Sequence, residues 1–214
     1  MKLYDYFRSS ACYRVRIGLQ LKGLDYDAVS VHLVRDGGEQ LKPDYREINP
    51  TGLVPVLKDG GATLTQSMAI LEYLDETHTT SPLLPADAAG RARVRSLALM
   101  IACDIHPLDN LRVLRYLVKQ AGLTEDAKNA WYAHWVQEGF TALEAHLAAS
   151  ADTGRFCHGD TPTLADCFLV PQVFNAVRFC IDITPYPTIA RIDEACRALP
   201  AFQAAHPSQQ PDAE

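Results

Sequence analysis

Residues 4–21 read YDYFRSSACYRVRIGLQL, and this stretch decides how the start of the chain folds. A short β-prone run around Tyr6 meets two serines, and apolar and polar residues alternate after them. Alternation alone would fit a strand, so the period does not separate strand from helix. The serines at one end and Lys22-Gly23 at the other favour a helix over residues 11–21.

The turn between this strand and this helix contains Ser9 and Ser10. Such a turn presents serine hydroxyls and unpaired backbone N–H groups at a single point. Both kinds of group donate hydrogen bonds, so we expect this turn to hold an anion.

The chain has 214 residues, enough for one large domain or two small ones with a substantial core. Its hydrophobic content of 48% and charged content of 21% are typical of a soluble globular protein. The net charge of −6 provides no basic surface for nucleic acid or an anionic membrane. No apolar run approaches a membrane span and no signal-peptide pattern follows Met1, so we expect a cytoplasmic protein.

The spacing of cysteines and histidines indicates no metal site. The six cysteines form no C-x-x-C pair, so we expect free thiols that are mostly buried. The seven histidines are dispersed along the chain. The cysteines are Cys12, Cys103, Cys157, Cys167, Cys180 and Cys196.

The first eighty residues predict the element order β-α-β-α-β-β-α. After the first helix, the predicted elements are a strand at 26–31, a short helix or turn at 41–48, strands at 53–57 and 62–64, and a helix at 68–74 capped by Ser67. Pro55 is unexpected inside a strand, because proline cannot donate to a sheet ladder. It indicates an edge, a bulge or a cis peptide whose neighbouring backbone is offered to a ligand.

Residues 81–87 are typical of an interdomain linker, and almost everything after them is typical of helix. The predicted helices cover 88–118 with a kink at His106-Pro107, 124–149, 167–177 and a short segment from Pro187. Thr163 and Asp166 form a capping-box-like start, which gives Asp166 a structural role. The end from Pro207 is expected to fray. The sequence therefore predicts an α/β domain over residues 1–80 and an all-helical domain over 88–214.

Three short motifs in this element order resemble glutathione transferases: Val54-Pro55, Gln66-Ser67 and Thr163-Leu-Ala-Asp166. The opening stretch resembles the zeta-class signature F-R-S-S-C-x-W-R-V-R-I-A-L. Further matching segments are Asp36-Gly-Gly38, Asn49-Pro50, Leu83-Leu-Pro85, Pro107-Leu-Asp-Asn110, Leu169-Val-Pro-Gln172 and Thr184-Pro-Tyr-Pro187. The resemblance spans the chain and implies a thioredoxin-like α/β domain with a mixed four-stranded sheet, followed by an all-α helical bundle.

The zeta class implies maleylacetoacetate isomerase activity, with the closely similar bacterial maleylpyruvate isomerases beside it. Both isomerise a cis double bond with glutathione as cofactor, by reversible addition of its thiolate, and family members are generally homodimers. The alternatives are a conjugating glutathione transferase, a thiol reductase that uses Cys12, and a non-catalytic glutathione-binding protein.

The chain departs from the zeta signature at two positions. Ala11 stands where the signature has cysteine, and Tyr13 stands where it has tryptophan or histidine. Cys12 follows one residue after the signature cysteine, and one helical residue turns a side chain by about 100°. Cys12 is therefore not expected to take over the role of the family cysteine.

A thiol with a pKa of about 8.5 is mostly protonated at neutral pH, and a hydroxyl hydrogen bond plus a helix N-terminus favours its thiolate. Ser9 and Ser10 lie where these two effects meet. The resemblance implies that Ser9 is the main donor to the glutathione thiolate, with Ser10 close by. The alternative is that both serines only cap the helix.

Two segments are implied as the main glutathione contacts. Gln66 and Ser67, at a helix start, suit the γ-glutamyl carboxylate, and the resemblance assigns it to them. The Val54 backbone is implied to pair with the cysteinyl unit, beside a cis Pro55.

Three further residues are implied as glutathione neighbours: Gln40, His106 and Asn110. For Gln40 the alternative is a solvated polar residue. For His106 the alternative is a residue exposed by the helix kink.

The implied substrate carries two carboxylates on a diketo chain, and the planar fork of arginine matches carboxylate geometry. The resemblance implies that Arg8 and Arg178 lie in the substrate pocket. Arg112 would add a third cation and leans towards the maleylpyruvate-type members, whereas the alternative is a solvated helix arginine. Arg14 and Arg16 are expected to be structural ion-pair partners.

Overall fold

The computed structural model describes residues 1–214, which form two compact units. The first unit comprises Met1–Leu83 and Ala198–Glu214, and the second comprises Leu84–Arg197. The chain passes from the first unit to the second within residues 81–87. The last seventeen residues were expected with the helical domain, but they group with the α/β unit instead.

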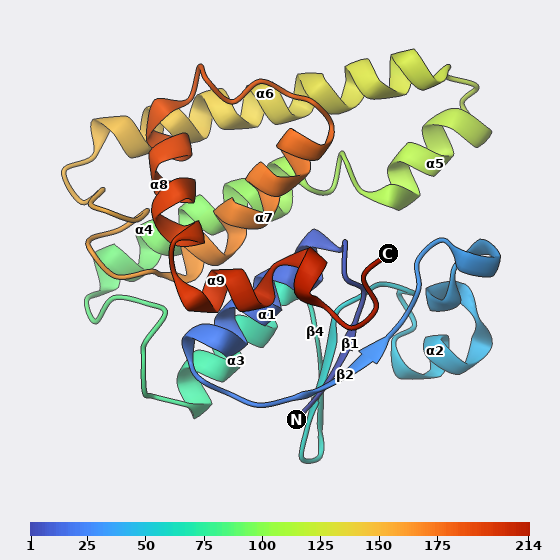
Figure 1. The fold of residues 1–214 in the computed structure, drawn as a ribbon, viewed down its shortest axis with the longest axis horizontal. Coiled ribbons are helices and arrows are strands. Elements are labelled where there is room, and N and C mark those ends of the chain that lie inside the picture. Colours follow the sequence, from blue (N-terminus) through green and yellow to red (C-terminus); the bar gives the residue numbers. More distant parts are fainter. The chain divides into compact units, whose positions relative to one another are not determined.

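The first unit contains a four-stranded sheet (Figure 1). Its strands are β1 (Lys2–Asp5), β2 (Asp27–Ser30), β3 (Val56–Asp59) and β4 (Ala62–Thr65), in the order β2-β1-β3-β4. β1 is parallel to β2 and antiparallel to β3, and β3 and β4 form an antiparallel pair. The predicted mixed sheet is confirmed. β3 begins later than predicted because Pro55 has no N–H to donate to the ladder.

Helices cover this sheet, and two of them approach very closely. The helices of the unit are α1 (Ser10–Leu21), α2 (Pro43–Ile48), α3 (Ser67–Thr77) and α9 (Pro200–Ala205), with 3₁₀ turns at Arg35–Gly37, Glu39–Leu41 and Pro207–Gln209. α1 packs against both α3 and α9 (Figure 1). A Cβ atom at Gly18 of α1 would lie only 2.1 Å from Leu71 Cδ2 of α3, so a larger residue would displace the Leu71 side chain from its buried position.

The last residues of the chain pack against the first unit and are not frayed. Phe202 and Ala205 are buried, and the Ala205 carbonyl accepts a hydrogen bond from Arg16 Nε at 3.0 Å. The Asp212 carboxylate accepts a hydrogen bond from the Phe7 N–H at 3.2 Å. The expected fraying from Pro207 is therefore wrong, because contacts with residues near the start of the chain hold this segment.

The second unit is entirely helical. Its helices are α4 (Ala88–Leu99), α5 (Leu111–Lys119), α6 (Glu125–Ala149), α7 (Leu164–Arg178) and α8 (Pro187–Arg197), with a π-helical segment at Met100–Ile105. The predicted kinked helix over 88–118 is instead two helices, since the chain leaves helical structure after Ile105 and re-enters it at Leu111. Pro107 lies in this gap, and its missing N–H cannot continue a helix.

The predicted capping box is confirmed at the start of α7. Asp166 Oδ2 accepts hydrogen bonds from the Thr163 N–H at 2.7 Å and from the Thr163 hydroxyl at 2.9 Å. Asp166 Oδ1 accepts one from the Cys157 N–H at 2.9 Å. The Asp166 side chain is fully buried, so it fixes the start of the helix from within the core.

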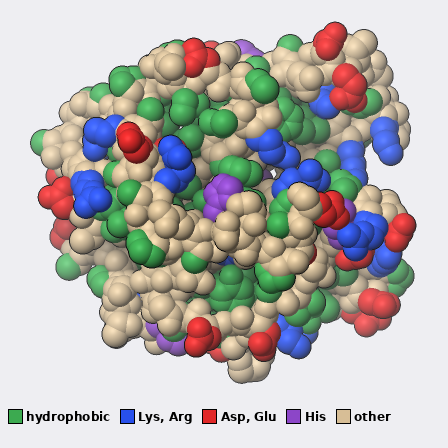
Figure 2. Space-filling view, in the orientation of Figure 1, with side chains coloured by type: hydrophobic (Ala, Val, Ile, Leu, Met, Phe, Trp, Pro, Cys, Tyr) green, Lys and Arg blue, Asp and Glu red, His purple; other side chains and the backbone are tan.

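Acidic and basic side chains are both distributed over the face of the molecule shown in Figure 2. None of the helices combines the length and the apolar character needed to cross a membrane. All six cysteines are free thiols, as predicted, and four of them are buried.

Candidate active site

Ser9 lies in the turn that connects β1 to α1. Its N–H donates to the Tyr6 carbonyl at 2.9 Å and closes a four-residue turn, residues 6–9, termed here the Ser9 turn. Ser9 is the N-cap of α1, and its Oγ accepts a hydrogen bond from the Cys12 N–H at 3.3 Å. Ser10 is the first residue of α1 and is buried. The turn therefore places a half-buried hydroxyl at the positive end of a 12-residue helix.

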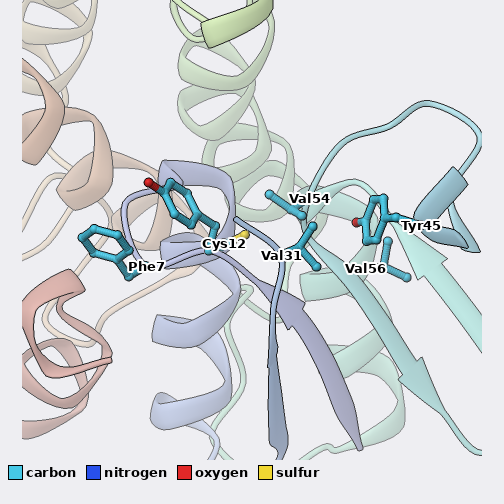
Figure 3. Packing of buried hydrophobic residues seen from close by; sticks show 7 residues of the cluster. Phe7, Cys12, Val31, Tyr45, Val54 and Val56 are labelled. Atoms are coloured by element: carbon cyan, nitrogen blue, oxygen red, sulfur yellow. The ribbon is translucent and has the colours of Figure 1, made fainter. Parts of the chain in front are cut away.

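Cys12 points into the core beneath this turn (Figure 3). It is fully buried in a cluster that includes Phe7, Val31 and Val56. Burial raises the pKa of the Cys12 thiol well above its usual value, and the nearby Asp5 carboxylate adds to the effect. A buried thiol that stays protonated is a poor nucleophile, which agrees with the expectation that Cys12 does not replace the family cysteine.

The start of α3 is a second place that can hold an anion. Ser67 is the first helical residue and Gln66 occupies the N-cap position, so the prediction of Ser67 as the N-cap is wrong by one residue. Gln66 has a φ of 69°, a backbone conformation that is uncommon for residues other than glycine. Its side chain makes no capping hydrogen bond, and the first turn contains no acidic residue. The chain therefore supplies no anion of its own to this helix end.

Arg14 connects the two helix starts. Its side chain is buried, and Nη1 donates a hydrogen bond to Ser67 Oγ at 3.3 Å. A guanidinium from α1 thus adds positive charge beside the start of α3. Arg16, two residues later, forms the expected structural ion pair with Asp5 at 2.7 Å.

Gln40 is buried, with only 6% of its surface exposed, so the alternative of a solvated glutamine is wrong. Its Nε2 donates to the Leu33 carbonyl at 3.3 Å, whereas Oε1 has no hydrogen-bond partner. A buried acceptor without a donor is costly, so Gln40 Oε1 is an unsatisfied polar atom in this unit.

Val54 lies in the buried cluster that also contains Cys12 (Figure 3). The Val54-Pro55 peptide is cis, as the resemblance implied. The Leu53 carbonyl just before it accepts hydrogen bonds from Tyr45 Oη at 2.7 Å and from Asn49 Nδ2 at 2.8 Å. These bonds fix the backbone on which the implied glutathione contact depends.

Arg8 lies inside the Ser9 turn and has no carboxylate partner within the chain. Its Nη2 donates to Tyr6 Oη at 2.9 Å, and its guanidinium lies 5.7 Å and 5.2 Å from the centres of the Tyr6 and Phe7 rings. The aromatic rings orient this cation without neutralising it, so Arg8 can bind an external carboxylate.

In the second unit, His106, Asn110 and Arg112 meet at the break before α5. Asn110 is the N-cap of α5, and its Oδ1 accepts a hydrogen bond from the Arg112 N–H at 3.0 Å. Asn110 Nδ2 lies 3.3 Å from His106 Nε2. Trp131 Nε1 donates to the Leu108 carbonyl at 2.9 Å and secures the segment. The Arg112 residue is exposed.

Asp109, in the same segment, was not among the residues singled out from the sequence. Its side chain is buried, and neither carboxyl oxygen has a hydrogen-bond partner. Burial raises the pKa of the Asp109 carboxyl to about 8. It lies in the family-matching segment Pro107-Leu-Asp-Asn110, but its position one residue before the N-cap of α5 is typical of an exposed turn aspartate, so the sequence gives no sign of its burial.

Arg178 is the last residue of α7, and the residue is exposed. Its guanidinium lies 5.0 Å from the centre of the Phe179 ring. Phe179 in turn stacks on Tyr132, with ring centres 3.7 Å apart. This aromatic pair supports a cation at the end of the helix.

The first unit therefore joins Ser9, Arg14 and Ser67 through the starts of α1 and α3. The second unit joins His106, Asn110 and Arg112 in a single turn. The first set offers donors for a thiolate and a carboxylate, and the second offers a cation and polar side chains.

Comparison with known proteins gives a consistent result over the whole chain. Residues 8–77 match the glutathione S-transferase N-terminal domain, and residues 129–207 match the glutathione S-transferase C-terminal domain. The chain is 52% identical over 212 residues to the maleylpyruvate isomerase of a Ralstonia species, covering 99% of both sequences.

Two solved structures extend this comparison. The maleylacetoacetate isomerase of Methylobacterium extorquens, solved with malonate and glutathione, is 46% identical with a TM-score of 0.96 and covers 100% of both chains. That of Anaeromyxobacter dehalogenans, solved with dicarboxyethyl glutathione and citrate, is 47% identical with a TM-score of 0.85, covering 100% of this chain and 97% of the other. The chain therefore belongs to the glutathione S-transferase family and, within it, to the zeta class.

Proposed function

We propose that the protein is a glutathione-dependent cis–trans isomerase that converts maleylacetoacetate to fumarylacetoacetate. Relatives named for this reaction are about half identical to the chain over nearly its full length. One solved relative holds dicarboxyethyl glutathione, in which the glutathione sulfur is bonded to a saturated dicarboxylate. That thioether is the type of bond that reversible thiolate addition would form.

The reaction begins when the glutathione thiolate attacks the alkene carbon that is conjugated to a carbonyl. A C–S bond forms, and the alkene electron pair moves onto the carbonyl oxygen as an enolate. The former double bond is now single and rotates. Collapse of the enolate re-forms the double bond as trans and expels the thiolate, so glutathione is regenerated and no atom is gained or lost.

Ser9 has the first role in this scheme: its hydroxyl donates a hydrogen bond to the glutathione thiolate at the positive end of α1. Ser10 stands beside it at the start of the same helix. The γ-glutamyl carboxylate binds Gln66 and Ser67 at the start of α3, where Arg14 adds positive charge.

The remaining glutathione contacts come from the backbone at Val54-Pro55 and from the unpartnered acceptor of Gln40. His106 and Asn110 provide further polar contacts from the second unit. Each of these residues either has a free acceptor or is held in place by a neighbouring hydrogen bond.

Three arginines bind the dianionic substrate: Arg8, Arg112 and Arg178. A carboxylate bound by a guanidinium fork is held in a defined plane, which orients the alkene for attack. Arg8 is adjacent to Ser9 along the chain, so it brings one substrate carboxylate close to the bound sulfur.

The observation that carries the proposal is the Ser9 turn itself, where an N-cap hydroxyl stands beside an arginine with no carboxylate partner. The direct test is an ultraviolet assay of purified protein with maleylacetoacetate and with maleylpyruvate, each with and without glutathione. We expect isomerisation that depends strictly on glutathione. Equal rates without glutathione, or no turnover of either acid with it, would contradict the proposal.

A second candidate substrate, maleylpyruvate, is favoured by Arg112 and by the maleylpyruvate isomerase relative. The two acids differ by one methylene next to a carboxylate, and pockets discriminate such a difference only modestly. The ratio of kcat/KM for the two acids, measured side by side, decides between them. If Arg112 favours maleylpyruvate, Arg112→Leu lowers kcat/KM for that acid more than for maleylacetoacetate.

We further propose that the protein is a cytoplasmic homodimer. Six free thiols and no disulfide suit a reducing compartment. The dimer is a property of the family, and light scattering of the purified chain tests it directly. A monomer at micromolar concentration would contradict it.

A further inference from the structure

The segment 198–214 reaches the Ser9 turn by two routes. Its helix α9 packs against α1, and the Ala205 carbonyl holds Arg16 Nε at 3.0 Å. Beyond α9, Asp212 Oδ2 accepts a hydrogen bond from the Phe7 N–H at 3.2 Å. A part of the chain about two hundred residues distant in sequence thus touches the turn that carries the proposed thiolate donor.

The peptide N–H and C=O groups of Tyr6 and Phe7 are all hydrogen-bonded within the chain. The Tyr6 N–H donates to Asp5 Oδ1 at 2.8 Å, and the Tyr6 carbonyl accepts from the Ser9 N–H at 2.9 Å. The Phe7 carbonyl accepts from Arg16 Nη2 at 2.9 Å. Asp212 supplies the fourth bond. Without Asp212, the Phe7 N–H would lose its only hydrogen-bond partner in the chain.

Two carboxylates fasten this end segment, and only one of them touches the Ser9 turn. Asp212 Oδ2 also accepts a hydrogen bond from the Ser30 hydroxyl at 2.9 Å. Glu214 lies 3.1 Å from His32 Nε2 and accepts from Arg35 Nη2 at 3.0 Å. It makes no hydrogen bond to the turn, and it reaches Tyr6 only through the His32 ring, whose centre lies 4.9 Å from that of Tyr6. The chain therefore contains its own control for the loss of one negative charge in this segment.

We propose that Asp212 is a positioning residue for the isomerase site: it fixes the Phe7 peptide and, through the Ser9 turn, the direction of the Ser9 hydroxyl. This inference rests on the proposed role of Ser9 in holding the glutathione thiolate. Asp212 touches neither thiol nor substrate. Asp212 acts on the angle of the hydrogen bond from the Ser9 hydroxyl to the thiolate. Hydrogen bonds weaken steeply when the donor–hydrogen–acceptor angle departs far from linear.

The test compares Asp212→Ala and Asp212→Asn with Glu214→Gln in the full-length protein. Two readouts report on the turn: the pKa of glutathione bound to the enzyme, followed by thiolate absorbance, and hydrogen exchange at the Phe7 amide without ligand. We expect Asp212→Ala to lower kcat about tenfold, to raise the pKa of bound glutathione and to speed Phe7 exchange. Glu214→Gln should change kcat less than about twofold.

Further variants separate positioning from general loosening of the fold. Ser30→Ala removes the other partner of Asp212 and should leave kcat nearly unchanged. In a Ser9→Ala background, Asp212→Ala should cause no further rise in the pKa of bound glutathione. Equal effects of Asp212→Ala and Glu214→Gln on kcat and on Phe7 exchange would overturn the inference, as would faster exchange with an unchanged pKa of bound glutathione.

The two proposals fail in distinguishable ways. If Ser9→Ala leaves the pKa of bound glutathione unchanged, the thiolate role of Ser9 is wrong and the positioning role falls with it. If Ser9→Ala raises that pKa while Asp212→Ala does not, only the inference about Asp212 is wrong.

Discussion

The starts of α3 and α7 solve the same physical problem in opposite ways. Every helix leaves backbone N–H groups without intrahelical partners at its first turn. At α7 the chain supplies its own carboxylate: Asp166 accepts hydrogen bonds from Thr163 and Cys157. At α3 the first turn has no acidic residue, and the Gln66 side chain forms no cap.

The difference separates a structural helix start from one prepared for a ligand. Asp166 is completely buried, so no external anion can reach the start of α7. The start of α3 instead has the Arg14 guanidinium beside it and an exposed Gln66 before it. In the proposed binding mode, a carboxylate from glutathione does at α3 what Asp166 does at α7.

Removing the internal anion of α7 should cause the largest loss. Asp166→Ala leaves the Thr163 and Cys157 N–H groups buried without acceptors, so we expect the free energy of unfolding to fall by about 3–4 kcal/mol. Urea denaturation followed by circular dichroism measures it. Asp152→Ala, an exposed acid of the same unit, is the control and should stay within about 0.5 kcal/mol. A similar loss in both variants would show that the capping box adds little.

At α1 the proposed mechanism depends on the Ser9 hydroxyl rather than on a carboxylate. Ser9→Ala removes the donor to the glutathione thiolate, so we expect kcat to fall about 100-fold while the Kd for glutathione changes little. Stopped-flow turnover and calorimetric titration measure the two quantities. Ser9→Thr keeps the hydroxyl and is the matched control. Unchanged turnover in Ser9→Ala would contradict the mechanism.

Asp109 sharpens the comparison because it is a buried carboxyl without partners, unlike Asp166. Its pKa is raised by burial from 3.8 to about 8. Between those pH values the folded chain retains a proton that the unfolded chain has lost, so this group lowers stability as pH rises. We expect the free energy of unfolding of Asp109→Asn to exceed that of the wild type by several kcal/mol, at most about 5 kcal/mol, at pH 8 and not at all near pH 4.

Urea denaturation of both proteins at several pH values measures this difference in the free energy of unfolding. Asp104→Asn, at an exposed acid of the same unit, is the control and should show no such pH dependence. A constant difference between Asp109→Asn and wild type across this range would argue against a raised pKa of Asp109.

Giving α3 an internal carboxylate should make its start resemble that of α7. Ser67→Asp places a negative charge beside Arg14 and the helix end, where it competes with the glutathione carboxylate. We expect the Kd for glutathione to rise about tenfold without loss of thermal stability. Ser67→Asn, of nearly the same shape but neutral, should raise it much less. If Ser67→Asp and Ser67→Asn raise the Kd equally, the γ-glutamyl carboxylate of glutathione does not bind at the start of α3.

The smallest effect is expected at Cys12. Because its thiol is buried with a raised pKa, Cys12→Ala should change kcat less than about twofold once protein concentration is corrected for folding. Steady-state assays of both forms measure this. Near-total loss of turnover would assign the nucleophile to the protein instead of to glutathione.

The sequence predicted those parts of the fold whose signals are local. The turn serines, the Thr163–Asp166 capping box and the β3–β4 hairpin each lie within a few residues of their partners. Their positions held to within a few residues, apart from the start of β3, where Pro55 cannot join the ladder.

Features that depend on residues far away in the sequence could not be predicted from it. Asp109 looks like an ordinary turn residue, and only the packing of the second unit buries it. Asp212 lies in a proline-containing end that is typical of a frayed terminus, yet its partner is Phe7. A pattern within a short window carries no information about such contacts.

Gly18 has a consequence for the length of the ligand that the site accepts. It lies nine residues after Ser9, about 13 Å along α1, and touches no proposed ligand group. Its missing side chain leaves room for Leu71 of α3 to pack directly against α1. In the proposed binding mode, the packing of α1 on α3 at Gly18 therefore bears on the span from sulfur to γ-glutamyl carboxylate, although neither end of the tripeptide reaches this residue.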